Sequence, residues 1–134
     1  MKYLRIFFGV FMLFFGLNRM FHFMPEPPWP EAAQQFLNAL EATGYMSELI
    51  SITDALAGAL LLANVLVPVA LILSAGILVH SILFHVFLAP ETALFAFIGA
   101  LINIVLIYHY RQSYLPLVTN NLPREIVVPE PERS

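Results

Sequence analysis

The chain contains no cysteine, and few of its residues carry charge. The absence of thiols excludes disulfide exchange and thiolate metal ligation, so any redox role would need a bound cofactor or quinone. Only 11% of the residues are Asp, Glu, Lys or Arg, and between Arg5 and Arg111 the single basic residue is Arg19. This distribution provides no basic patch for nucleic acid, so nucleic-acid binding is not expected.

Apolar residues, in contrast, are abundant. They make up 60% of the 134 residues, and the mean hydropathy is +0.80. That composition leaves too little polar surface for a soluble domain, so we predict an integral membrane protein in contact with the lipid bilayer. Counting about 20 apolar residues per crossing places four helical spans at residues 3–23, 47–63, 67–88 and 92–110. The short links between spans predict an all-α fold, an antiparallel four-helix bundle within residues 1–114.

The first apolar run follows Lys2 and Arg5, as the core of a secretory signal would. No small-x-small cleavage pattern follows it, and Asn18 and Arg19 interrupt its end, so we interpret it as a span. Basic residues lie near both ends of the chain, whereas the first loop is acidic and has no Lys or Arg. The positive-inside rule therefore predicts a multi-pass inner-membrane protein with both termini in the cytoplasm.

The loop after the first span contains a second kind of helical pattern. Within residues 31–43, Phe36, Leu37 and Leu40 recur at helical spacing, opposite a polar face. We expect a short amphipathic helix on the outer leaflet, with Trp29 as an interfacial anchor before it. This helix either covers the end of the bundle or acts as a lid over a pocket reached from outside.

Residues 115–134 differ from the rest of the chain because prolines and charges replace the apolar period. We predict an extended or disordered cytoplasmic tail. Two interpretations remain open for it: a solvated tail, or a segment that docks a soluble partner through its apolar residues 126–128.

Two charged residues fall inside the apolar runs, Arg19 in the first and Asp54 in the second. An ionisable group in hydrocarbon costs at least about 2.5 kcal/mol, so each is a candidate functional residue. Both share a helix face with small residues, which is the face that packs between membrane helices. We therefore predict an intramembrane ion pair in the outer half of the bundle. The candidates for the further hydrogen bonds that a desolvated pair requires are Asn18, Ser51, Thr53 and Ser81.

The third span carries two histidines, His80 and His85. They are five residues apart, a rotation of about 140° on a helix, so they do not grasp one metal ion from the same face. No metal site is expected, and nothing in the spacing demands haem. The helical spacing allows either of two faces of this span to point into the bundle. One carries Ser74, Leu78, Ser81 and His85, and the other Gly76, His80, Phe84 and Phe87.

A guanidinium, a carboxylate and an imidazole in one pocket suit a quinone head group, which needs hydrogen-bond donors at two carbonyl oxygens and a proton route. The candidate ligand-binding residues are Arg19, Asp54, His80, His85, Asn18 and Ser81. The expected aromatic lining comes from Phe15, Phe84, Phe87 and Trp29. No covalently bound cofactor is expected. A second interpretation is equally open, in which the charged pair only fixes the helix register.

Three segments carry a family resemblance. They read R-I-F-F-G-V-F-M-L-F-F-G-L-N-R-M-F-H-F at residues 5–23, I-T-D-A-L-A-G-A-L-L-L at 52–62 and S-I-L-F-H-V-F-L-A-P-E at 81–91. Together they resemble the DoxX family of small four-helix membrane proteins, over residues 3–117. That family often has Lys or Arg where Arg19 stands, and Glu where this chain has Asp54.

The resemblance implies a subunit of a quinone-linked oxidase or of another membrane oxidoreductase assembly. The alternative is a non-catalytic scaffold or assembly factor for partner proteins. A chain of 15.1 kDa without a cofactor motif is expected to act as a homo-oligomer or a subunit, not as a complete enzyme.

Overall fold

The computed structural model describes residues 1–26 and 28–118. That part of the chain is helical and contains no strand. Its elements are α1 (Lys2–Phe21), α2 (Glu31–Ala42), α3 (Met46–Ala63), α4 (Val67–Leu88), η1 (Pro90–Thr92), α5 (Ala93–His109), η2 (Arg111–Ser113) and α6 (Leu115–Val118). Most of the predicted tail, residues 119–134, lies outside the described residues.

Within the described residues, four segments are long and apolar enough to cross a membrane: α1, α3, α4 and the continuous stretch Pro90–His109. Much of their apolar surface faces outward, as Phe87 (77% exposed) and Leu101 (63% exposed) illustrate. Side chains of this size favour hydrocarbon over water by about 1.5–3 kcal/mol each, so they are stable on the outside only in a bilayer. The chain is therefore a multi-pass membrane protein.

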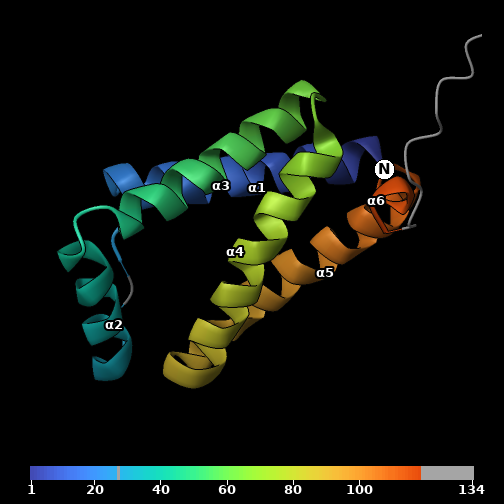
Figure 1. Ribbon diagram of the computed structural model, residues 1–134. Helices are drawn as coiled ribbons and strands as arrows, with labels where there is room; N and C mark the ends of the chain where they lie inside the picture. Colours follow the sequence, from blue (N-terminus) through green and yellow to red (C-terminus); the bar gives the residue numbers. More distant parts are fainter. Residues whose placement is uncertain (27, 119–134) are drawn as a thin grey trace, which may run out of the picture.

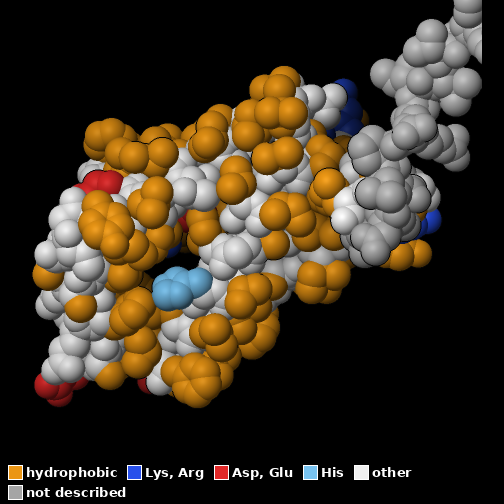
Figure 2. Space-filling model, in the orientation of Figure 1, with side chains coloured by type: hydrophobic (Ala, Val, Ile, Leu, Met, Phe, Trp, Pro, Cys, Tyr) orange, Lys and Arg blue, Asp and Glu red, His pale blue; other side chains and the backbone are white. Residues whose placement is uncertain are grey.

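The spans associate in two pairs. Helix α1 packs along α3, α4 packs along α5, and α3 and α4 join the pairs, with a smaller contact between α1 and α5. In Figure 1 the two pairs meet where α1 begins and diverge toward the end that carries α2. A closed bundle therefore stays a prediction for the protein in its membrane, because the two pairs separate near α2 (Figure 1). The surface between α2 and α4 is hollowed there (Figure 2), and this hollow is the opening near α2.

Small residues create the most extensive helix contact, that of α1 with α3. A Cβ atom on Gly58 would lie 2.4 Å from the backbone nitrogen of Leu13, and one on Gly16 would lie 2.7 Å from that of Ala55. These helices therefore touch backbone to backbone at two levels, which only glycine permits. The contact fixes α1 and α3 relative to each other.

The pair of α4 and α5 is joined by a polar contact. Asn103 of α5 is 3% exposed and donates from Nδ2 to the carbonyl oxygen of Leu71 (3.1 Å) and to Ser74 Oγ (3.0 Å). Ser74 and Leu78 are buried, whereas His80 is exposed. The inward row of the third span is therefore the one that runs through Ser74 and Leu78.

At the end where α1 begins, a tight turn and one long-range hydrogen bond stabilise the structure. The turn from α3 to α4 places Asn64 and Leu66 in the left-handed region, with φ of 57° and 49°. Tyr114, just after η2, donates its hydroxyl to the carbonyl oxygen of Pro68 at 2.7 Å. Burial raises the pKa of Tyr114, so the phenol stays protonated and remains a donor.

Candidate functional site

The predicted ion pair between Arg19 and Asp54 is present and joins the last turn of α1 to the middle of α3. Arg19 Nη1 donates to Asp54 Oδ2 at 3.1 Å. The side chain of Arg19 is 41% exposed, whereas that of Asp54 is 5% exposed. Among the described residues, nothing donates to the other carboxylate oxygen, Asp54 Oδ1, although it is buried. One hydrogen-bond acceptor of the pair is therefore unused.

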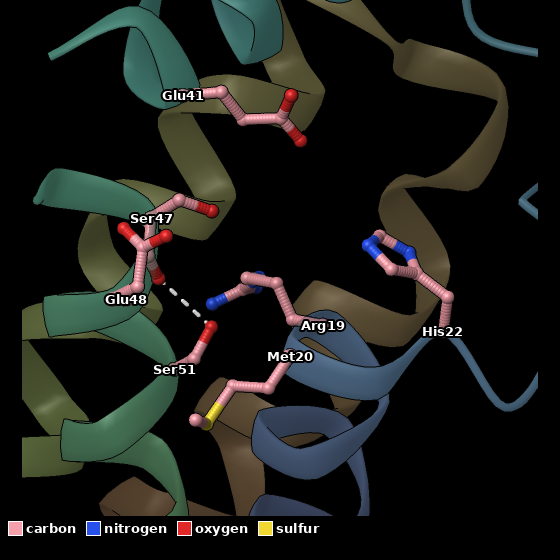
Figure 3. A pocket seen from close by; sticks show the side chains of 7 residues that line it. All are labelled: Arg19, Met20, His22, Glu41, Ser47, Glu48 and Ser51. Atoms are coloured by element: carbon pink, nitrogen blue, oxygen red, sulfur yellow. Dashed lines mark hydrogen bonds between the residues drawn. The ribbon is translucent and has the colours of Figure 1, made fainter. Parts of the chain in front are cut away.

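A cleft of about 260 Å³ opens beside Arg19, and Asp54 is not among the residues that line it. Its lining comes from the end of α1, from α2 and from the start of α3: Arg19, Met20, His22, Glu41, Ser47, Glu48 and Ser51. Figure 3 shows the Arg19 side chain extending toward Ser51 and Glu48 of α3, with Glu41 and His22 farther out. The cleft thus places a guanidinium among carboxylates and hydroxyls, a mixture of donors and acceptors that suits a small polar group.

The residues predicted to donate further hydrogen bonds to the ion pair make other contacts instead. Asn18 Oδ1 accepts from the backbone N–H of Met24 at 2.9 Å and so holds the chain after α1. Ser51 and Thr53 each donate to a carbonyl oxygen one turn earlier in α3. Across the part of the chain that is described, no hydrogen bond joins Asn18, Thr53 or Ser81 to the ion pair. The pair is left without the additional donors expected for it.

The two histidines of α4 belong to a separate aromatic–histidine cluster, formed by Trp29, Phe36, His80, Phe84 and His85. Phe36 of α2 lies with its ring centroid 5.6 Å from that of His80 and 5.6 Å from that of Phe84. Trp29 lies 5.6 Å from Phe84 and 6.1 Å from His85. The cluster connects α2 and the segment before it to α4.

His85 has a defined hydrogen-bond environment. Its Nδ1 is 2.8 Å from the hydroxyl of Thr92 and 3.4 Å from the carbonyl oxygen of Ala89. These contacts connect the end of α4 to η1. In residues 1–26 and 28–118, no hydrogen bond, ion pair or ring contact links His80 or His85 to Arg19 or Asp54. The candidate residues therefore lie in two groups on either side of the opening near α2.

The expected aromatic lining is distributed between several places. Trp29 and Phe84 lie in the aromatic–histidine cluster. Phe15 packs on Phe11 with a centroid distance of 4.6 Å, and Phe87 is 77% exposed. None of these four side chains lines the cleft beside Arg19.

Arg5 is a functional candidate that its position in the sequence does not indicate, because a place near the N-terminus points only to membrane topology. Its side chain is 7% exposed and donates from Nη1 to the carbonyl oxygen of Leu61, in the last turn of α3. A cation at this position stabilises the negative end of the helix dipole. The sequence does hold a signal that Arg5 is buried, because Arg5 lies on the same helix face as Gly9, Met12, Gly16 and Arg19. These residues follow one another at alternating spacings of four and three.

We expect Arg5→Met to lower the free energy of unfolding by about 2 kcal/mol, since it removes a charged donor from a buried carbonyl. The measurement is equilibrium unfolding in mixed micelles. Lys2→Gln is the matched control, because it removes a basic side chain that is exposed at the same end. Equal effects of the two substitutions would contradict a specific role for Arg5.

No three His, Asp or Glu side chains of the described residues lie close enough to hold a metal ion. The Arg19–Asp54 pair supports hydrogen bonding by a partly exposed guanidinium and by a buried carboxylate.

The fold and the buried charged pair define a small helical membrane protein with a polar cleft at one end. The family model for DoxX matches residues 1–96, and the chain belongs to the DoxX family. Comparison with curated proteins and with solved structures found no match. The matched region includes α1 to α4 and the start of α5, and thus both groups of candidate residues.

Proposed function

We propose that this protein is a quinone-interacting subunit of a membrane oxidoreductase assembly, in which Arg19 and Asp54 bind the quinone head group. The observation that carries the proposal is the unused hydrogen-bonding capacity of the Arg19–Asp54 pair, of which Arg19 lines the cleft. Asp54 Oδ1 is buried without a partner, and the Arg19 side chain is 41% exposed. A buried acceptor without a donor is costly, so a ligand hydroxyl would stabilise it.

The two members of the pair suit the two forms of a quinone. The N–H groups of Arg19 donate to a quinone carbonyl oxygen, and Asp54 Oδ1 accepts from the O–H of the reduced form. A bound quinone supplies the two-electron chemistry that the protein's own side chains lack. Glu48 and Glu41 line the same cleft as Arg19 and are exposed, so they are able to pass protons to water.

The opening near α2 provides a route from the bilayer. Figure 2 shows the surface hollowed between α2 and α4, with a histidine side chain at the rim of the hollow. The contact of Phe36 with His80 places α2 beside this opening, which suits the lid, one of the two roles that the sequence leaves open for this helix. In this proposal His80 and His85 border the approach of the head group and do not contact the Arg19–Asp54 pair.

We further propose that the α2 end of the molecule faces away from the cytoplasm of an inner membrane. Basic residues at the opposite end, Lys2, Arg5 and Arg111, support this orientation. As a 15.1 kDa subunit, the protein would act as a homo-oligomer or within a larger complex. Both chain termini would then lie on the cytoplasmic side.

The proposal is tested by titrating purified protein in detergent with a short-chain benzoquinone. Trp29 is the only tryptophan and lies in the aromatic–histidine cluster, so quinone binding should quench its fluorescence. We expect Arg19→Gln and Asp54→Asn each to weaken binding about tenfold or more, since hydrogen bonds to charged groups contribute about 1.5–3 kcal/mol.

Ser74→Ala is the matched control for this titration. It removes an interhelical hydrogen bond between α4 and α5 and leaves the charged pair intact. Its quinone affinity should equal that of the unmodified protein. Saturable quenching of the same affinity in Arg19→Gln would refute the assignment of the site.

A scaffold or assembly factor is the second candidate function. It is favoured by the place of the ion pair, which bridges the two helices that pack most extensively. If the pair serves only this purpose, Arg19→Gln lowers thermal stability and the recovery of partner proteins together, and quinone does not quench Trp29 in any variant.

A further inference from the structure

Charge is segregated along the molecule. Outside the Arg19–Asp54 pair, the basic residues of the described part of the chain lie where α1 begins or α5 ends: Lys2, Arg5 and Arg111. The acidic residues of the same part lie in or beside α2, at the start of α3 and in η1: Glu26, Glu31, Glu41, Glu48 and Glu91. The two ends of the protein therefore present opposite charge to the two membrane surfaces.

A second groove, of about 410 Å³, lies at the basic end. Its lining comes from the residue before α1, from the end of α5 and from the first residue of η2: Met1, Ile104, Val105, Tyr108, His109 and Arg111. The lining is apolar along Ile104 and Val105 and becomes basic toward His109 and Arg111. Such a gradient matches a molecule with an apolar chain and an anionic head.

Arg111 is held in position within this groove. Its Nη1 donates to the carbonyl oxygen of Tyr108 at 3.0 Å, and its guanidinium carbon lies 4.4 Å from the centroid of the Tyr108 ring. Stacking of this kind restricts the rotamers of the side chain. The planar guanidinium keeps further N–H groups that suit a phosphate, and an imidazole N–H of His109 provides another donor beside it.

We propose that this groove binds an anionic phospholipid. The phosphate accepts hydrogen bonds from Arg111 and His109, and the first methylene groups of an acyl chain pack on Ile104, Val105 and the Tyr108 ring. The apolar part of the lining selects a lipid over free phosphate, because inorganic phosphate would leave that surface uncovered. The basic end selects an anionic lipid over a zwitterionic one. The site is independent of the proposed quinone site, which lies at the other end of the molecule.

The test is native mass spectrometry of the protein released from bilayers that contain equal amounts of phosphatidylglycerol and phosphatidylcholine with matched acyl chains. We expect retained phosphatidylglycerol to exceed phosphatidylcholine. Arg111→Gln should reduce this preference about fivefold, which corresponds to one basic side chain near an anionic lipid surface. Arg111→Lys should restore part of it. Inorganic phosphate should not displace the lipid.

Lys2→Gln is the control for diffuse attraction, since Lys2 follows Met1 but does not line the groove. It should change lipid retention less than twofold, as should Arg19→Gln at the opposite end. An equal loss in Lys2→Gln and Arg111→Gln would overturn the proposal, as would equal retention of both lipids or displacement by inorganic phosphate. Thermal unfolding of the Lys2 and Arg111 variants should match that of the unmodified protein, because both side chains are exposed.

Discussion

Replacing Arg19 by methionine while Asp54 remains should lower the free energy of unfolding by about 3 kcal/mol, the lower end of the cost of breaking a buried ion pair. The lower end applies because the Arg19 side chain is 41% exposed, whereas that of Asp54 is 5% exposed. The loss arises from the carboxylate, which keeps neither its partner nor access to water. Equilibrium unfolding in mixed micelles measures it.

The reverse substitution provides the matched comparison. In Asp54→Leu the guanidinium left behind is half-open and reaches water in the cleft, so the loss should be smaller than in Arg19→Met. The double variant Arg19→Met, Asp54→Leu should recover most of the stability, because no buried charge remains. If the double variant loses as much free energy of unfolding as the two single variants together, the two residues are not coupled. The ion pair would then not stabilise the protein.

Gly58→Ala should destabilise the protein by about 3 kcal/mol, at the upper end of the usual cost of overpacking. The added Cβ would lie 2.4 Å from the backbone nitrogen of Leu13 and 2.7 Å from the carbonyl oxygen of Gly9. Both contacts are with backbone, so no side chain is able to move aside, and α1 must separate from α3. Thermal unfolding in detergent is the measurement.

Gly76→Ala is the control for the loss of a glycine within a helix. A Cβ at Gly76 meets nothing within 4 Å, so this substitution should be neutral or should stabilise α4 by up to about 1 kcal/mol. A Gly58→Ala variant as stable as Gly76→Ala would show that α1 and α3 do not approach as closely as the structure places them.

The helices were predictable because each is a local property of the chain. Long apolar runs separated by Asn64 or Pro90 predict helical spans, and a polar backbone inside hydrocarbon must satisfy its own hydrogen bonds. The partner of Arg19 was predictable for a related reason. With few ionisable residues in the spans, Asp54 was the one carboxylate at a matching depth.

The surroundings of that pair were not predictable, because they depend on how the helices splay. Asn18 is adjacent to Arg19 in the sequence and was a candidate partner of the ion pair. In the structure its side chain instead accepts a hydrogen bond from the backbone N–H of Met24. His85 or His80 was expected beside the pair, but the two helix pairs diverge. The structure places His85 with Trp29 and Thr92, and His80 with Phe36. A row of residues on a helix shows which face is buried and does not show which partner covers it.

By itself, the sequence determined the class of this protein, its spans, the charged pair and the family. These follow from composition and from periodicity, which act within one helix. Only the tertiary structure decided that Arg5 binds the end of α3, that the cleft beside Arg19 is lined by polar residues, and that the histidines lie apart from it. The reason is that Gly16 and Gly58 hold α1 and α3 in backbone contact, while α2 and the aromatic–histidine cluster border the opening that remains.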